Sequence, residues 1–345
     1  MKKLNCCILA ALFLGGCLFF GSAVPAFSDT ITLRMAEPSP KRGTEVVWVD
    51  WFTKELEKRT FGRVKVKVYW GGALAKLKEG AEACKTGVSD LGWVTNAYHP
   101  GFGSLAKVPY AAGFFSPNPS PVFLTDKWLK MNDNIPALYE EYEKTNMIPF
   151  IMRWYDVYWS FSNKPVRSLS DYKGMKVRAV TQLQQIGFKA IGAVPVFLPF
   201  GEVYGALQKG IVDAVASSPD TAARYKIHEV TKYVIRHDIM GAWAQWCINL
   251  NTFKKLNWLD QKTLLQLGRE VSMMIADINE KQRQKLIGVF EKAGLEIIPF
   301  PEKDKEVWAA KPQLLQYTEK FIKEEEEKGY PAREMVDYYL KLVNQ

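Results

Sequence analysis

Residues 163–233 read NKPVRSLSDYKGMKVRAVTQLQQIGFKAIGAVPVFLPFGEVYGALQKGIVDAVASSPDTAARYKIHEVTKY. Short apolar runs alternate here with helical segments. The runs are Met175–Val180, Val194–Leu198 and Ile211–Ala216, and the helical segments are Leu183–Ile191 and Glu202–Lys209. Strands and helices that alternate at this spacing are typical of βαβ units in a mainly parallel sheet. The sequence therefore predicts an α/β fold.

Polar side chains stand where two of these predicted strands end. Arg178 lies near the end of the first run, and Ser217 and Ser218 follow the last one. Sheets of this kind bind ligands in the crevice beyond the carboxyl ends of their strands. We therefore expect a fixed cation and two hydroxyl groups on one rim of a ligand cleft. The alternative for Arg178 is a structural ion pair with a nearby acidic residue.

The same stretch resembles the signature of a known family. The segments KPV, LSDYKGMKVRAV and IGAVPVFLPFGEVYGALQKGIVDAV are similar to the pattern of solute receptors of TRAP (tripartite ATP-independent periplasmic) transporters, the DctP-type family. Upstream, RVKVKVY, GG, DLG and YHPG resemble the family's opening pattern. The resemblance implies a two-lobed periplasmic binding protein fold with a long spine helix and C-terminal helices. It also implies that Arg178, which matches the arginine of the K-[IV]-R strand, grips the substrate carboxylate.

The chain departs from the family pattern at two places. Many TRAP receptors carry a second arginine shortly before the KP element, where this chain has Tyr158 and Trp159. Receptors for polar dicarboxylates and sugar acids often use that charge, so its absence argues against those substrates. Many relatives also read QENP where this chain reads VASSP, so Ser217 or Ser218 replaces an amide side chain. The ligand must then lie closer to these hydroxyl groups or reach them through water.

Aromatic residues gather where the chain is expected to cross between the lobes. Trp154, Tyr155, Tyr158 and Trp159 fall within six residues, and Trp243 lies on the predicted return strand, residues 237–250. These rings form either the hydrophobic wall of a ligand pocket or core between sheet and helices. The predicted strand of residues 90–94 also leads into polar and aromatic candidates for the cleft. These candidates are Trp93, Thr95, Asn96 and Tyr98.

These arguments define an expected ligand-binding set. Its members are Arg178, Ser217, Ser218, Trp154, Tyr155, Trp243, Asn96, Trp93, Tyr158 and Phe200. We expect this set to bind an organic acid, with an aromatic or otherwise apolar monocarboxylate favoured. No cofactor and no metal are expected, because His99, His228 and His237 lack metal-ligand spacing and no cysteine cluster joins them.

The N-terminal residues differ in composition from the rest of the chain. Lys2 and Lys3 precede the apolar stretch Cys6–Phe20, and small residues follow it. Residues 1–28 are therefore predicted to be a secretory signal peptide, which implies a periplasmic protein. A lipoprotein signal is the alternative, because LGGC ending at Cys17 resembles a lipobox, although apolar residues follow the cysteine.

Charge and motifs limit the classes of function. The net charge of +9 falls to +7 once the two lysines of the leader are subtracted, and the basic residues are spread along the chain without a nucleic-acid-binding motif. We therefore expect no nucleic-acid partner. A receptor of an ABC transporter or sensor system is the alternative of the same class. An exported enzyme on a two-lobed scaffold is the alternative of another class, although no catalytic motif supports it.

The order of the predicted strands and helices along the chain predicts the domain organisation. Lobe I is expected to comprise residues 29–152 and 240–285, and lobe II residues 153–239 and 286–303, with C-terminal helices from 304 to 345 packed on the lobes. Asp260–Lys292 reads as one helix, close to 50 Å long at about 1.5 Å per residue. Two terminal helices are predicted, over residues 304–328 and 331–343. By resemblance the partners are the small and large TRAP membrane subunits, and a monomer is expected.

Three of the five cysteines, Cys6, Cys7 and Cys17, fall within the predicted leader. The other two, Cys84 and Cys247, are expected to be separately buried thiols because one lies in a helical pattern and the other in a strand pattern. A disulfide between them is the alternative in an oxidising compartment.

Overall fold

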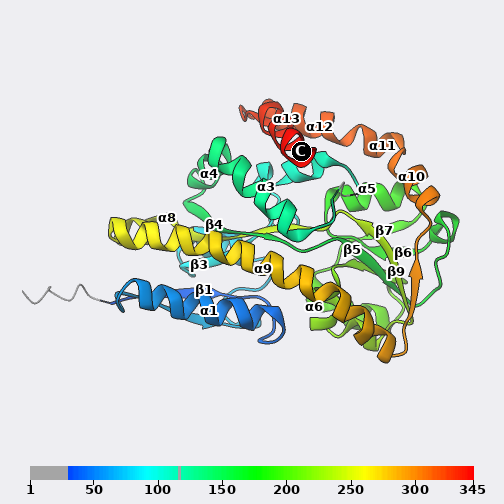
Figure 1. Cartoon of the computed structure of the whole chain (residues 1–345), viewed down its shortest axis with the longest axis horizontal. Coiled ribbons are helices and arrows are strands. Elements are labelled where there is room, and N and C mark those ends of the chain that lie inside the picture. The colour runs from blue at the N-terminus through cyan, green and yellow to red at the C-terminus, as the bar shows by residue number, and fades with distance from the viewer. Residues whose placement is uncertain (1–29, 116–117) are drawn as a thin grey trace, which may run out of the picture.

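The computed structural model describes residues 30–115 and 118–345. They form two β-sheets with helices packed around both (Figure 1). This arrangement confirms the α/β fold class that the sequence predicts. The expected signal peptide and the lipobox at Cys17 lie outside the described residues. Within the described part of the chain, none of the helices combines the length and the apolar character needed to span a membrane.

Lobe I is built on a five-stranded sheet with the strand order β2-β1-β3-β10-β4. Its strands are β1 (Ile31–Ala36), β2 (Val64–Tyr69), β3 (Leu91–Val94), β4 (Met147–Trp154) and β10 (Trp243–Asn249). β1 pairs in parallel with β2 and β3, whereas β10 runs antiparallel to β3 and β4. The helix α1 (Thr44–Arg59) covers this sheet, since Trp48 packs edge-on against Trp246 and Phe52 packs against Phe150.

Lobe II is built on a six-stranded sheet with the order β11-β9-β5-β8-β6-β7. Its strands are β5 (Tyr158–Ser162), β6 (Lys176–Arg178), β7 (Val194–Val196), β8 (Ala214–Ser217), β9 (Tyr233–Ile239) and β11 (Glu296–Pro299). β6 pairs in parallel with both β7 and β8. The helices α5 (Gln182–Ala190) and α6 (Phe200–Gln208) connect these strands. The βαβ units expected from residues 163–233 are therefore confirmed.

The return path between the lobes differs from the prediction. The single strand expected over residues 237–250 is two strands, β9 in the lobe II sheet and β10 in the lobe I sheet. Gly241 lies between β9 and β10 and packs against Asp156, which lies between β4 and β5 where the chain first crosses between the sheets. A Cβ atom at Gly241 would lie 1.8 Å from the Asp156 carbonyl oxygen. Tyr155 N donates to Ala242 O at 3.0 Å, so the two crossings lie side by side. This pair of crossings connects the two sheets.

The helix α9 (Trp258–Lys292) joins the backs of both lobes, as expected of a spine helix. It is 35 residues long, which corresponds to about 50 Å. Gly268 allows it to approach β4 closely, because a Cβ atom there would lie 2.0 Å from Phe150 O. At the other end, Phe290 packs against Phe161 in lobe II, with ring centroids 5.1 Å apart.

The C-terminal segment contains four helices where the sequence predicts two. They are α10 (Glu302–Ala309), α11 (Pro312–Leu315), α12 (Tyr317–Glu326) and α13 (Ala332–Val343). Pro312 lacks the N–H group that would continue α10, and it takes a first-turn position in α11. We call residues 302–343 the C-terminal arm. It runs from lobe II to lobe I along one edge of the molecule (Figure 1).

The remaining helices cover the faces and edges of the two sheets. They are α2 (Gly80–Thr86), α3 (Pro121–Asn134), α4 (Ala137–Glu143), α7 (Pro219–Arg224), α8 (Leu250–Lys255) and the 3-10 helices η1 (Ser104–Ala112), η2 (Leu169–Tyr172) and η3 (Ile227–Glu229). Cys84 and Cys247 are both buried and free, which confirms two separate thiols.

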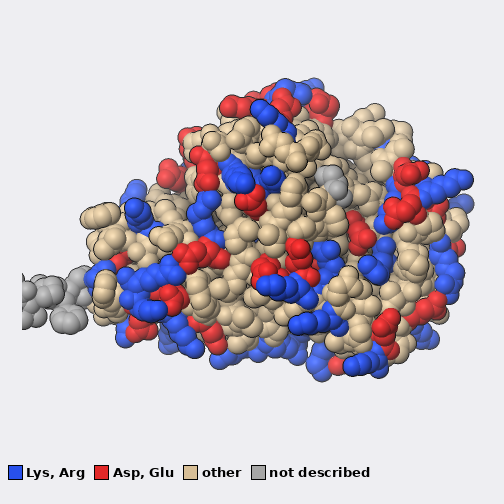
Figure 2. All heavy atoms as spheres, in the orientation of Figure 1, with Lys and Arg blue, Asp and Glu red and all other residues tan. Residues whose placement is uncertain are grey.

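On the face drawn in Figure 2, basic and acidic side chains are interspersed over both lobes.

Candidate functional site

A small cavity lies between the two lobes, with a volume of about 50 Å³. Lobe I contributes the loop after β1 and the residues after β3, and lobe II contributes the ends of β6 and α7 and the start of α6. The two crossings supply Tyr155, Tyr158, Ala242 and Trp243. This volume holds only a few water molecules. The lobes are closed at the cavity, because Arg178 of lobe II donates to the Tyr98 hydroxyl group of lobe I at 2.8 Å. We call this cavity the cleft cavity.

Arg178, at the end of β6, lines the cleft cavity and is 1% exposed. Its Nε donates to Leu198 O at 3.1 Å, and its Nη2 donates to the Tyr98 hydroxyl group at 2.8 Å. The guanidinium carbon lies 4.8 Å from the Phe200 ring centroid. Among the described residues, no carboxylate lies within ion-pair distance of Arg178. A buried cation without a counter-ion costs several kcal/mol, so this site is prepared for an anion.

Tyr98 links the lobes at Arg178. It belongs to the segment after β3 in lobe I, and its hydroxyl oxygen accepts hydrogen bonds from Arg178 Nη2 and from Phe200 N, the latter at 3.1 Å. Its ring packs against Trp93 and against Phe197. The YHPG element marks Tyr98 as a cleft candidate in the sequence, but only the fold shows that it bonds to Arg178.

Six of the ten residues in the expected ligand-binding set line the cleft cavity. They are Arg178, Tyr155, Trp243, Trp93, Tyr158 and Phe200. Trp93 Nε1 donates to the Tyr155 hydroxyl group at 3.0 Å, which fixes both rings. Some of the aromatic residues near the crossings therefore form a wall of the cavity, and others form core between sheet and helices. Trp159, for example, packs in the lobe II core, where its Nε1 donates to Asp238 at 2.6 Å.

The structure places the other four members of the set elsewhere. Trp154 is buried in the core, with its ring centroid 4.9 Å from that of Trp243. Asn96 lines a neighbouring cavity together with Lys107 and Tyr110. Ser217 donates to Ser218 O at 3.2 Å, and the Ser218 hydroxyl group caps the N-terminus of α7. Both serines are buried and do not line the cleft cavity.

A second arginine, which the sequence analysis missed, also lines the cleft cavity. Arg224, the last residue of α7, donates to Ser39 Oγ at 3.1 Å and pairs with Glu45 of α1. Arg153 of β4 pairs with the same carboxylate. Burial alone would raise the pKa of Glu45, but the charges of the two arginines outweigh it and lower that pKa to about 2. The sequence analysis found no motif around Arg224, so only the fold shows that it lines the cleft cavity.

This charged cluster joins the two lobes. Arg224 and Asp220 come from α7 in lobe II, whereas Ser39, Thr44 and Glu45 come from lobe I. Thr44 Oγ1 donates to Asp220 Oδ1 at 2.8 Å, beside the Arg224–Glu45 pair. Opening of the lobes must separate these partners. The cluster therefore stabilises the closed conformation.

The histidines do not form a catalytic or metal-binding arrangement among the described residues, where no group of three His, Cys, Asp or Glu side chains is placed to hold a metal ion. Burial lowers the pKa of His99 to about 4 and that of His237 to about 3. His237 Nε2 bonds to the Ser160 hydroxyl group at 2.8 Å inside lobe II. Both are neutral, structural side chains at pH 7.

The model of the bacterial extracellular solute-binding protein family 7, DctP, matches residues 37–324. The chain belongs to this family. A solute-binding protein of Verminephrobacter eiseniae is 26% identical over 297 residues, which cover 85% of this chain and 86% of that protein. The 2,3-diketo-L-gulonate-binding periplasmic protein of Escherichia coli is 24% identical over 84% of this chain and 86% of its own length.

Solved structures of TRAP receptors share the fold of this family-7 protein. A TRAP periplasmic solute-binding protein of Desulfovibrio salexigens has a TM-score of 0.74 at 26% identity, covering 91% of this chain and 95% of that one. A marine metagenome TRAP solute-binding protein has a TM-score of 0.80 at 17% identity, covering 91% of this chain and 98% of that one. The TRAP resemblance and the two-lobed fold are thus confirmed. The protein is an extracytoplasmic transport receptor and not an enzyme.

Proposed function

We propose that this receptor closes its two lobes around a small organic acid whose carboxylate is held by Arg178. The observation that carries the proposal is the buried guanidinium group without an acidic partner among the described residues. A guanidinium group is always charged and binds both carboxylate oxygens in one plane. A bound carboxylate replaces the missing counter-ion and offsets the cost of burying the arginine.

The favoured ligand is an aromatic or otherwise apolar monocarboxylate. Five aromatic residues line the cleft cavity, namely Trp93, Tyr155, Tyr158, Phe200 and Trp243. Micromolar binding requires about 8 kcal/mol, more than one ion pair supplies, so ring contacts must contribute. Structural relatives bind aromatic acids as well as polar ones. A marine metagenome receptor was solved with 3-hydroxybenzoate, and a Bordetella pertussis receptor binds pyroglutamic acid.

The transport partners follow from the family. Receptors of this kind deliver a small solute to membrane permease subunits, and we propose the small and large TRAP subunits as the partners of a monomeric receptor. Export through the signal peptide at residues 1–28 would place it in the periplasm, with lipoprotein anchoring at Cys17 as the alternative. The lobe ranges 29–152 with 240–285 and 153–239 with 286–303 remain our proposal for the moving units.

Thermal unfolding against a panel of acids tests this function. The panel contains 3-hydroxybenzoate, pyroglutamate, succinate and glucuronate. A ligand at about 100 times its dissociation constant adds roughly 2.7 kcal/mol to the free energy of unfolding, and we expect this for an aromatic or apolar monocarboxylate. Stabilisation by succinate or glucuronate alone would keep the receptor function and contradict the proposed ligand class.

The substitution Arg178→Ala tests the carboxylate site directly. Removing the charge that pairs with the ligand should weaken binding about 100-fold or more, measured by isothermal titration calorimetry with the acid that stabilises the wild type. The matched control is Arg236→Ala, because Arg236 also lies in lobe II and stacks over Trp159 without lining the cleft cavity. Unchanged affinity in Arg178→Ala would contradict the role of Arg178.

A further inference from the structure

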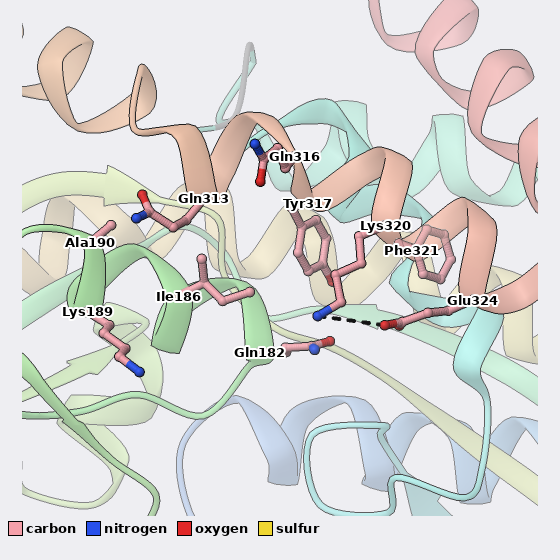
Figure 3. A pocket seen from close by; sticks show the side chains of 10 residues that line it. All are labelled: Gln182, Ile186, Lys189, Ala190, Gln313, Gln316, Tyr317, Lys320, Phe321 and Glu324. Atoms are coloured by element: carbon pink, nitrogen blue, oxygen red, sulfur yellow. Dashed lines mark ion pairs between the residues drawn. The ribbon is translucent and has the colours of Figure 1, made fainter.

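A second and larger cavity lies at the C-terminal arm, between α5 and the helices α11 and α12 (Figure 3). Its volume is about 530 Å³, whereas that of the cleft cavity is about 50 Å³. We call it the arm cavity. Its volume lies in the range that small-molecule sites in proteins usually have.

The walls of the arm cavity belong to different lobes. α5 follows β6 directly in lobe II, whereas α12 is attached to lobe I through Glu325, which accepts a hydrogen bond from Ser104 at 2.6 Å and pairs with Lys107 at 3.3 Å. The beginning of the arm is attached to lobe II instead, since Trp308 Nε1 donates to Gly187 O at 2.8 Å. The arm therefore crosses from one lobe to the other at the cavity. A relative movement of the lobes must change the distance between its walls.

The lining of the arm cavity suits an anion with a flat apolar body. Lys189 of α5 and Lys320 of α12 supply two positive charges against the one negative charge of Glu324, and Ile186 and Phe321 supply apolar surface. Figure 3 shows Lys320 reaching from α12 toward Gln182 of α5, and the Lys320 ammonium group pairs with Glu324 of its own helix at 3.8 Å. This pair is exposed to solvent, and such pairs contribute little. The ammonium group is thus available to a ligand.

A buried polar group in the wall also lacks a partner. The Tyr317 side chain is 4% exposed, and its hydroxyl group has no hydrogen-bond partner among the described residues. Figure 3 shows the Tyr317 ring extending from α12 into the space above Gln182 of α5. Leaving a buried hydroxyl group unpaired costs about 1–3 kcal/mol.

The arm cavity is linked to the cleft cavity through shared walls. A third cavity, of about 300 Å³, shares Ala97 and Val180 with the cleft cavity and shares Gln182 and Tyr317 with the arm cavity. Val180 and Gln182 follow Arg178 within four residues, in the turn that starts α5. Residues 178–182 of lobe II therefore line both cavities. Arg178 and Val180 line the cleft cavity, and Gln182 lines the arm cavity.

We propose that the arm cavity is a second binding site, for a small aromatic carboxylate, and that its occupation favours the closed conformation. This inference deepens the proposed function and rests on it for the coupling between the lobes. In the structure the arm cavity is present while the Arg178–Tyr98 and Arg224–Glu45 contacts join the lobes at the cleft, so a molecule that fits the arm cavity selects this arrangement. By linkage, it tightens cleft binding by the same factor by which the cleft ligand tightens binding at the arm.

Titration of 4-fluorobenzoate followed by fluorine NMR tests the second site. The protein is the full exported chain carrying Arg178→Ala, which removes the cleft site. We expect saturable binding in this variant, weakened at least tenfold when Lys189→Gln and Lys320→Gln are added. The matched control adds Lys173→Gln and Lys323→Gln instead, which remove one charge from lobe II and one from α12 outside the arm cavity. This control should bind within twofold of Arg178→Ala.

The outcomes separate the second site from the proposed function. Binding in the wild type that vanishes in Arg178→Ala supports the cleft and overturns the arm site. Binding that survives in Arg178→Ala and falls only with the Lys189 and Lys320 changes supports the arm site, whatever the cleft binds. Equal binding by the two charge-matched variants, or an absence of saturable binding to Arg178→Ala, overturns the inference.

The coupling to closure has its own measurement. The Arg178→Ala protein carries spin labels on Lys54→Cys in lobe I and Lys209→Cys in lobe II. Pulsed electron paramagnetic resonance then measures the distance between the two labels. Both positions are exposed, whereas the native Cys84 and Cys247 are buried. We expect 4-fluorobenzoate to raise the fraction of the shorter distance at least twofold. An unchanged distribution would overturn the coupling.

Discussion

At the scale of single residues, Arg178 and Tyr98 show how a site is assembled from distant parts of the chain. The KVR strand places Arg178, but the hydroxyl group that orients it comes from lobe I, 80 residues earlier. That bond joins the two lobes in this structure. Tyr98 thus contributes both to the orientation of the guanidinium group and to the contact between the lobes.

The substitution Tyr98→Phe tests this double role. It leaves Arg178 Nη2 and Phe200 N without their shared acceptor, at a cost of about 1.4 kcal/mol, or tenfold in affinity. Calorimetric titration with the acid identified in the panel measures the loss. Tyr204→Phe serves as the control, because the Tyr204 hydroxyl group bonds to Glu229 on the surface and does not line the cleft cavity. Equal affinity in Tyr98→Phe and the wild type would exclude the orienting role.

Glu37 provides a residue-scale prediction about pH. Burial, followed by the charge of Glu45, raises the pKa of Glu37 from 4.5 to about 8. A raised folded-state pKa contributes stability that is complete below the unfolded pKa and is lost as the pH rises through the folded one. Urea unfolding between about pH 5 and pH 8 should therefore show a loss of stability that Glu37→Gln reduces. The exposed change Glu202→Gln should leave the pH dependence as in the wild type, and an unaltered profile in Glu37→Gln would contradict this assignment.

At the scale of elements, the spine helix α9 holds lobe I through a close contact. Gly268 lies directly over β4, whereas Gly288 on the same helix has no atom within 4 Å of a Cβ position. The helical pattern of residues 260–292 predicts the helix. It does not distinguish these two glycines, because the difference depends on what lies across the interface.

The pair of substitutions Gly268→Ala and Gly288→Ala tests this contact. A methyl group at position 268 must displace the Phe150 carbonyl group, so we expect a loss of about 1–3 kcal/mol in the free energy of unfolding. At position 288 alanine should be neutral or stabilising by up to about 1 kcal/mol, because it favours the helix. Denaturant unfolding measures both, and equal effects would show that the spine can shift freely on β4.

At the scale of the whole molecule, closure is a balance between ligand contacts and contacts that the protein makes by itself. The Glu45–Arg224 and Thr44–Asp220 contacts join the lobes at the cleft, and the arm joins them again at the opposite edge (Figure 1). With the spin labels at positions 54 and 209 in otherwise wild-type protein, the panel acid should shift the distances toward the shorter state. Removal of Arg178 should abolish that shift, and a shift that persists without Arg178 would contradict ligand-driven closure.

The sequence by itself determined the fold class, the family and the central arginine. Alternating strands and helices over residues 163–233, the KVR strand and the long helix of residues 260–292 are local patterns, because helix and strand periodicities and turn residues are encoded within short windows. The sequence analysis also favoured a receptor over an enzyme because no catalytic motif was found, and the family assignment supports this.

Only the tertiary structure decided which side chains meet. It separated Trp154, in the core, from Tyr155, in the cleft. It also showed that Ser218 caps α7 and that Ser217 bonds to the Ser218 carbonyl group. It also brought Arg224 to the cleft cavity and opened a second cavity at the arm. These facts depend on contacts between residues far apart in the chain, and such contacts leave no periodic signal in the sequence of either partner.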